Sequence, residues 1–124
     1  MDRLRSFKNG EMIVDEDDLL PRVKDDRFNL FDAGDIRVNE NVVLSTLHTI
    51  FVREHNRMVK VIKKINQFLS DDQLFQGGRN YVISLLQKIT FKDFLPIMIG
   101  PKAYSEMIGE YKEYNSSVNP NIAN

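Results

Sequence analysis

The sequence contains no cysteine, so thiol catalysis, disulfide bonds and cysteine-ligated metal sites are excluded. No apolar run approaches the roughly 18 residues that a membrane span needs. The first residues, Met1-Asp2-Arg3-Leu4-Arg5, lack an apolar segment, and we predict that they are not a signal peptide. A net charge of -1 gives no general attraction to nucleic acid or to an anionic membrane surface.

The length and composition predict one folded unit rather than a disordered tail. The chain has 124 residues, of which 42% are hydrophobic and 28% charged. Residues 1–36 read as irregular, with Asn9-Gly10 predicting a hairpin turn and at most a small two-stranded ribbon. The acidic run at 15–18 fails as a calcium loop, because Leu20 stands where an EF-hand needs glycine and Asp26 where it needs glutamate.

Apolar periodicity predicts two long helices. The first spans roughly residues 40–66, where the apolar spacing of three, four and seven indicates one buried stripe. This stripe comprises Leu44, Leu47, Phe51, Met58, Ile62 and Ile65. A capping box, Ser70 with Gln73, opens the second helix, which we expect to reach about Ile89. Its predicted inward side chains are Leu74, Phe75, Gly78, Tyr81, Val82, Leu85 and Ile89.

Short elements are expected toward the end of the chain. Thr90 and Asp93 are candidate caps of one short turn, which Pro96 should end. Gly100-Pro101 predicts the start of another helix, closed by Gly109. Residues 110–124 form a polar tail with the triplet Asn115-Ser116-Ser117, either a chance occurrence or an N-glycosylation acceptor.

Four residues of the central region carry the candidate chemistry. Arg37 and Glu40 lie three residues apart before the first long helix, and spacing alone favours a helix-terminus carboxylate beside a surface arginine. His48 and His55 cannot share one metal ion on a straight helix. Seven residues rise about 10.5 Å, whereas imidazole binds metals at roughly 2 Å. We therefore predict no metal site.

Two ordered motifs resemble the animal haem peroxidase family. Residues 33–40 match the pattern AGDxRxNE, and residues 48–57 match HTxxxREHNR. Residues 87–100 are similar to the family's QxITxxDxLPxxLG segment, and residues 111–124 to the stretch before its proximal histidine. The likeness runs from about residue 4 to the last residue. It implies a mainly α fold, here a helical portion of a peroxidase domain with two long helices, short helices and an irregular N-terminal segment.

The resemblance implies a role for each matching residue. Arg37 would polarise the O–O bond of hydrogen peroxide as a fixed cation, and Glu40 would bind haem through an ester with a haem methyl group. The sulfonium link of one family branch is excluded, because Asn41 follows Glu40 where that branch has methionine. For the remaining polar residues of the second motif we expect roles in the core or in support of the residues around the site, with any buried charges paired. These are His48, Arg53, Glu54, His55, Asn56 and Arg57.

The family's distal histidine, its neighbouring aspartate, its calcium loop and its proximal histidine do not occur among these residues. We therefore expect an internal part of the domain (1–36 loop-rich, 37–109 helical, 110–124 tail) that is inactive alone. Its implied partners are the rest of the domain, hydrogen peroxide and a halide or organic donor. The implied cofactor is a b-type-derived haem, and the implied location secreted or lumenal. The alternatives are a truncated or pseudo-enzyme binding module and a relative in the fatty-acid dioxygenase branch.

Overall fold

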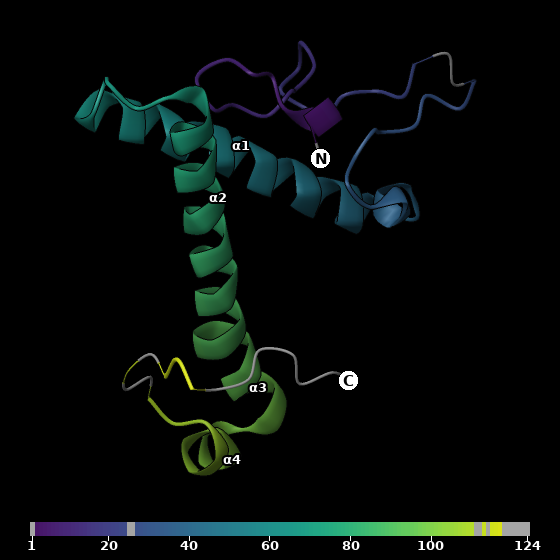
Figure 1. Ribbon diagram of the computed structural model, residues 1–124. Coiled ribbons are helices and arrows are strands. Elements are labelled where there is room, and N and C mark those ends of the chain that lie inside the picture. Colours follow the sequence, from purple (N-terminus) through teal and green to yellow (C-terminus); the bar gives the residue numbers. More distant parts are fainter. Residues whose placement is uncertain (1, 25–26, 111–112, 114, 118–124) are drawn as a thin grey trace. The chain divides into compact units, whose positions relative to one another are not determined.

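The computed structural model describes residues 2–24, 27–110, 113 and 115–117. Within these residues the fold is mainly helical and contains no strand, which confirms the predicted fold class (Figure 1). The helices are η1 (Asp2–Leu4), η2 (Ile36–Asn39), α1 (Val42–Ile65), α2 (Asp71–Lys88), η3 (Ile89–Phe94), α3 (Leu95–Ile99) and α4 (Pro101–Met107). The chain divides into two compact units, Met1–Leu86 and Gln87–Asn124, and each is described by itself.

The first unit opens with the predicted hairpin turn. Asn9 and Gly10 have positive φ angles of 59° and 73°, as a two-residue hairpin turn requires. An isolated antiparallel bridge pairs Arg5 with Met12, and the Ile13 N–H donates to the Leu4 carbonyl at 2.9 Å. The ribbon is short, so its remaining stability must come from the helices on which it lies (Figure 1).

Helix α1 begins and ends close to the predicted positions, but it buries a different face. Its N-cap is Asn41, whose side-chain oxygen accepts a hydrogen bond from the Leu44 N–H at 2.9 Å. The predicted stripe is wrong at two of its members, because Leu47 is 46% exposed and Ile65 81% exposed. The buried residues of α1 are instead Thr49, His55, Asn56 and Val59. The apolar periodicity predicted the helix correctly, whereas contacts with the hairpin and α2 determine which face of α1 is buried.

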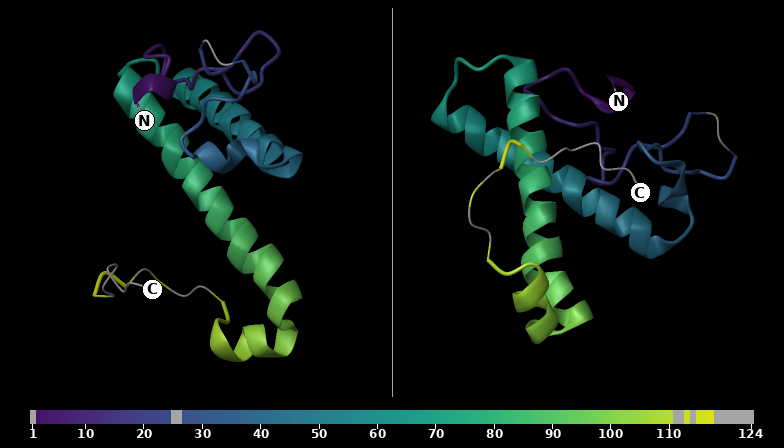
Figure 2. Two further views of the ribbon diagram at one scale, coloured as in Figure 1. Left: turned by 90° about the vertical axis from the view of Figure 1, so that its right-hand side faces the viewer. Right: turned by 60° about the horizontal axis from the view of Figure 1, so that its bottom comes forward.

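Helix α2 starts at the predicted capping box and packs on α1 through a glycine. The Ser70 N–H donates to Gln73 Oε1 at 2.9 Å, and the Gln73 N–H donates to Ser70 Oγ at 3.3 Å. Figure 2 shows the first half of α2 beside α1. At Gly78 a Cβ atom would lie 2.6 Å from Val59 Cγ2 and 2.8 Å from His55 Cε1. Glycine is therefore required there by the close approach of the two helices.

A buried arginine ties the N-terminal segment to the start of α2. The Arg5 guanidinium donates to Asp71 at 2.9 Å and to Asp72 at 3.0 Å, and its side chain is only 11% exposed. It also lies over the rings of Phe7 and Phe75, at 5.0 Å and 4.0 Å from their centroids. Two carboxylates in the first turn of α2 are favoured by the helix dipole, so this contact supports both segments.

The second unit corrects one prediction. Thr90 and Asp93 do not cap a separate turn, because residues 89–94 form the π-helix η3 and the chain continues into α3. Lys88 and Phe94, which precede η3 and α3, have helical dihedral angles, so no free helix start needs a cap. Pro96 lies at the beginning of α3 rather than at the end of a turn. The turn of the π-helix η3 is wider than an α-helical turn, and it accommodates Pro96, which has no N–H group to donate.

The last helix follows the prediction. Pro101 occupies the first position of α4 after Gly100, as its fixed φ angle favours. Gly109 has a φ of 64°, and its N–H donates to the Tyr104 carbonyl at 2.9 Å. This left-handed residue ends the helix as expected.

The adjacent glycines of α2 give a matched test of the helix contact. Gly78→Ala should lower the free energy of unfolding by about 1–3 kcal/mol, because the added methyl group overlaps atoms of α1. Gly77→Ala meets only the flexible Cδ1 of Ile62 at 3.0 Å. It should be neutral or stabilise the protein by up to about 1 kcal/mol through helix propensity. Urea unfolding followed by far-UV circular dichroism checks both, and equal effects would contradict the contact.

Candidate functional site

The segment from Ala33 to Glu40 is anchored by buried and clamped residues. Val38 is 1% exposed and belongs to a core cluster with Leu20 and Ala33. The Asn39 side chain donates to the Phe31 carbonyl at 2.9 Å and accepts from the Phe31 N–H at 2.8 Å. An amide that makes both bonds to one residue fixes the backbone on that side. The short helix η2 is thereby held in place, although its first two residues lie at the surface.

Arg37 is oriented by Asp35. Asp35 is the N-cap of η2 and accepts from the Arg37 N–H at 3.0 Å. The Arg37 guanidinium also donates to the same carboxylate, from Nε at 3.0 Å and from Nη2 at 2.6 Å. These bonds from Arg37 lower the pKa of Asp35 from 3.8 to about 2, and they raise the pKa of Arg37. The pair is exposed, so it orients the arginine more than it stabilises the fold.

Arg37 lies in η2, and Glu40, the C-cap of η2, follows it by three residues. Residues three apart are eclipsed in a 3₁₀-helix, and both side chains are exposed. The Glu40 N–H donates to the Arg37 carbonyl at 2.9 Å, which closes the turn. The structure thus brings together the two residues that the motif predicted, and adds Asp35 to them. The sequence reasoning missed Asp35, although an aspartate at a helix start two residues before an arginine was a usable signal.

Two residues of the second motif hold the hairpin on α1. His55 is 5% exposed, and its Nε2 lies 2.9 Å from the Gly10 carbonyl oxygen. Its ring contacts Phe75 with a centroid distance of 5.2 Å. The Asn56 side chain accepts from the Met12 N–H at 2.7 Å and donates to the Met12 carbonyl at 3.0 Å. The packing role expected for His55 and Asn56 is confirmed.

The other polar residues of the motif differ in their surroundings. His48 is half-buried, and its Nδ1 lies 2.8 Å from the Leu44 carbonyl oxygen. Glu54 accepts two bonds from Arg57, at 2.7 Å and 2.8 Å, and the pKa of Glu54 is lowered, chiefly by these bonds. Arg53 and Arg57 are exposed and therefore lie outside the core. Arg57 is paired with Glu54, as expected for charges near the core.

Two of the hollows beside α1 lie against α2 and against the hairpin. An apolar groove of about 520 Å³ lies between α1 and α2. It is lined by Met12, Leu44, Leu47, His48, Phe51, Val52, His55, Phe75, Arg79, Val82, Ile83 and Leu86. Its histidines are bonded to backbone carbonyl oxygens. Each imidazole therefore has one nitrogen engaged, and most of the groove is lined by apolar side chains of α1 and α2.

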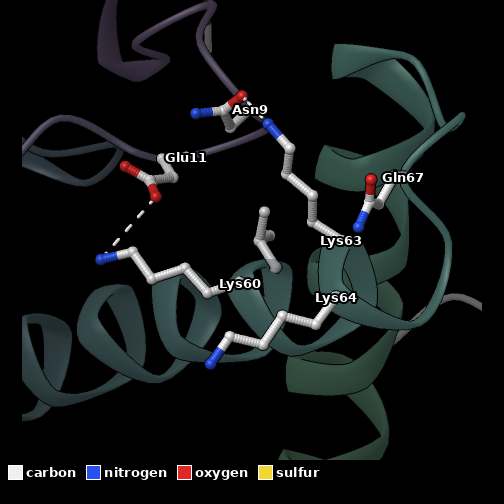
Figure 3. A pocket seen from close by; sticks show the side chains of 7 residues that line it. Asn9, Glu11, Lys60, Lys63, Lys64 and Gln67 are labelled. Atoms are coloured by element: carbon white, nitrogen blue, oxygen red, sulfur yellow. Dashed lines mark hydrogen bonds and ion pairs between the residues drawn. The ribbon is translucent and has the colours of Figure 1, made fainter.

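The second hollow, about 320 Å³, lies between the hairpin and the end of α1 (Figure 3). Lys63 donates to the Asn9 side chain, and Lys60 lies 3.7 Å from the Glu11 carboxylate. Lys64 comes from the same helix, one residue beyond Lys63. Two of the three lysines are thus engaged with the hairpin, and this hollow belongs to the seam that joins the hairpin to α1.

Comparisons with known proteins give the family of the chain. The family model for animal haem peroxidase matches residues 1–124. The chain belongs to the animal haem peroxidase family. Peroxidasin of Drosophila melanogaster is 50% identical over 94 residues, which cover 76% of this chain and 6% of that protein. Myeloperoxidase of Mus musculus is 42% identical over 98 residues, 79% of this chain and 14% of that protein. Eosinophil peroxidase of Mus musculus is 39% identical over 109 residues, covering 88% and 15% respectively.

These numbers set the scale of the match. The chain spans between 6% and 15% of the length of these three relatives. In the part of the chain that the structure describes, no three histidine or acidic side chains come together as a metal-binding group. None of the described helices combines the length and the apolar character of a membrane span.

Burial of His55 predicts a pH-dependent stability. Burial lowers the pKa of His55, against the opposing effect of its bond to Gly10, while the Arg5 charge lowers it further. The unfolded chain then binds more protons than the folded one just below pH 6.5, so stability falls as the pH drops through that region. Asp35 and Glu54 titrate in a lower range, because their pKa values are reduced from 3.8 and 4.5.

We expect the urea midpoint to decrease as the pH is lowered from about 7.5 to about 5.5, a window of about 1 unit either side of the unfolded histidine pKa of about 6.5. In His55→Gln this fall should largely disappear, because glutamine does not titrate. The matched variant His48→Gln should keep it. A His55→Gln protein whose midpoint falls with pH as steeply as that of the parent would contradict the assignment.

Proposed function

We propose that this chain supplies the peroxide-polarising arginine and the haem-linking carboxylate of a haem peroxidase domain. Residues 1–124 would form part of that domain. The enzyme would reduce hydrogen peroxide and oxidise a halide or an organic donor. The main support is that Arg37 in η2 and its C-cap Glu40 are both exposed, while Val38 and Asn39 fix the backbone between them. Family membership supports the same activity.

The residues present fit a haem group. The Glu40 carboxylate is exposed and accepts no hydrogen bond from a described residue, so it is accessible for an ester bond to a haem methyl carbon. Glu40 would hold the group covalently, and bound haem would supply the iron at which peroxide is reduced. A separation of three residues in a 3₁₀ turn would place the side chains of Arg37 and Glu40 next to each other on the solvent-facing side.

Arg37 suits the polarising role because part of its guanidinium is uncommitted. Nε and Nη2 donate to Asp35, while no described residue accepts a hydrogen bond from Nη1. Arginine stays protonated at any working pH and presents its donors in a fixed plane. Asp35 would act as a positioning residue that fixes the orientation of the Arg37 guanidinium, and Nη1 would then donate to a peroxide oxygen. The positive charge would favour the negative charge that develops as the O–O bond breaks.

The partners follow from the same proposal. Large apolar side chains at the groove are exposed, with Leu47 at 46%, Leu86 at 41% and Ile83 at 38%. An exposed apolar surface of this kind marks a contact with other protein. Because the relatives are several times longer than this chain, we infer that the remainder of the peroxidase domain covers it. We also propose that the enzyme enters the secretory route.

The arginine role predicts a kinetic defect. In the holoenzyme, Arg37→Ala should slow the reaction with hydrogen peroxide by roughly 10²- to 10³-fold, by analogy with the loss of one oxyanion donor. Haem should remain bound. Stopped-flow spectroscopy under single-turnover conditions measures the rate, with Lys64→Ala as a control that removes an exposed cation from α1. An Arg37→Ala enzyme that reacts at the parental rate would refute the role.

The carboxylate role predicts a different defect. Glu40→Gln keeps the shape of the side chain but removes the acid that forms the ester. The haem of this variant should become more extractable by acidic organic solvent, with a smaller loss of rate than in Arg37→Ala. Glu16→Gln, at an exposed loop carboxylate, is the control and should leave extraction unchanged. Unaltered extraction in Glu40→Gln would show that this carboxylate does not bind the haem.

A further inference from the structure

The dipeptide Asn9-Gly10 at the tip of the hairpin can undergo a chemical reaction of its own. It is the single Asn-Gly dipeptide of the sequence. In such a dipeptide the backbone nitrogen of glycine can attack the side-chain carbonyl carbon of asparagine and release ammonia, because glycine has no Cβ to hinder the approach. The asparagine is converted to aspartate or isoaspartate. The fold therefore decides whether Asn9 deamidates.

The backbone conformation of Asn9 keeps the reacting atoms apart. Its φ of 59° is in the left-handed region, where a residue with a side chain adopts ψ values of about +30° to +60°. At these angles the Gly10 nitrogen lies on the opposite side of the Cα–C bond from the Asn9 Cβ. The Asn9 Cγ is then out of reach of that nitrogen, and the ring of the intermediate cannot close until the turn opens.

The two reacting groups are also held by different helices. The buried Gly10 donates its N–H to Asp71 Oδ1 in α2 at 2.6 Å, and Arg5 holds the same carboxylate at 2.9 Å. The Asn9 side-chain oxygen accepts from Lys63 in α1 (Figure 3). The Gly10 nitrogen must lose its proton in order to attack, and the negative charge of Asp71 beside it opposes the negative charge that then develops. Both contacts must therefore separate before the reaction.

We propose that Asn9 is a latent deamidation site, which reacts only when the hairpin separates from α1 and α2. In the opened turn the Gly10 nitrogen bonds to the Asn9 Cγ and gives its proton to water. Asn9 Nδ2 takes up a proton and leaves as ammonia. Water then opens the resulting succinimide, chiefly to isoaspartate. No oxidation or reduction is involved.

The modification makes the opening of the hairpin irreversible. Isoaspartate lengthens the main chain by a methylene group next to Gly10. The Gly10 N–H and carbonyl can then no longer meet both Asp71 and His55, which they contact at 2.6 Å and 2.9 Å in the unmodified chain. The proposal goes beyond the peroxidase function and uses none of its residues.

The first test compares the folded and the unfolded full chain. One sample is kept in buffer and one in denaturing urea, at the same neutral pH and temperature, and peptide mass spectrometry follows the conversion of Asn9 with time. The folded chain should react at least about 10-fold more slowly, which corresponds to an opening free energy of at least about 1.4 kcal/mol. Equal rates in the two samples would overturn the proposal.

A matched pair of variants tests the contact of the Gly10 nitrogen. Asp71 and Asp72 both bond to Arg5 at the start of α2, and of the two it is Asp71 that accepts the Gly10 N–H. Asp71→Ala should raise the deamidation rate of Asn9 by about 10-fold, the effect of losing a hydrogen bond to a charged group. Asp72→Ala should stay close to the parental rate. Equal rates in the two variants would overturn the proposal.

A further series needs no variant, and it keeps local opening apart from a general loss of the fold. The parent chain is placed in urea concentrations below its unfolding transition. Hydrogen exchange of the Gly10 N–H and deamidation of Asn9 are measured on the same samples. Both rates should rise together, because both require the hairpin to open. A deamidation rate that stays constant while the Gly10 exchange accelerates would overturn the proposal.

Discussion

Gly10 joins the hairpin to both long helices through its two backbone groups. Its N–H donates to Asp71 in α2 at 2.6 Å, and its carbonyl accepts from His55 in α1 at 2.9 Å. Its φ of 73° is in the left-handed region, and a Cβ there would lie 2.5 Å from the Phe75 nitrogen. A side chain at this position would break the turn and both contacts at once. The contact of the hairpin with both long helices therefore depends on this glycine.

Two residues of the hairpin bond to two consecutive residues of α1. Gly10 ends the turn of the hairpin, and Met12 follows two residues later on its second arm. They meet His55 and Asn56, which follow each other on α1. Asn56 satisfies both polar groups of Met12, which would otherwise be costly to bury. Arg5 adds an ionic contact to Asp71, the same carboxylate that receives the Gly10 N–H. The motif residues thus hold a hairpin that has little stability of its own.

The sequence predicts those features that are decided locally. The Ser70–Gln73 capping box and the Gly109 helix end each depend on neighbours within a few residues, and each was found where the pattern placed it. The predicted stripe failed at Leu47 and Ile65, because the covered face of α1 is chosen by segments distant in sequence. The motif likewise includes Arg53 but does not show whether that residue lies on the buried or the exposed side of α1, and in the structure it is exposed.

The candidate site could be located from its motif, but its geometry could not. A regular α-helix would turn residues 37 and 40 by about 300°, leaving their side chains about 60° apart, whereas a 3₁₀ turn eclipses them. The structure has the 3₁₀ turn. Within it Val38 is buried in the core and Asn39 bonds to Phe31, so both intervening residues are held from the inner side. The residues between Arg37 and Glu40 therefore set the direction in which both of those side chains point.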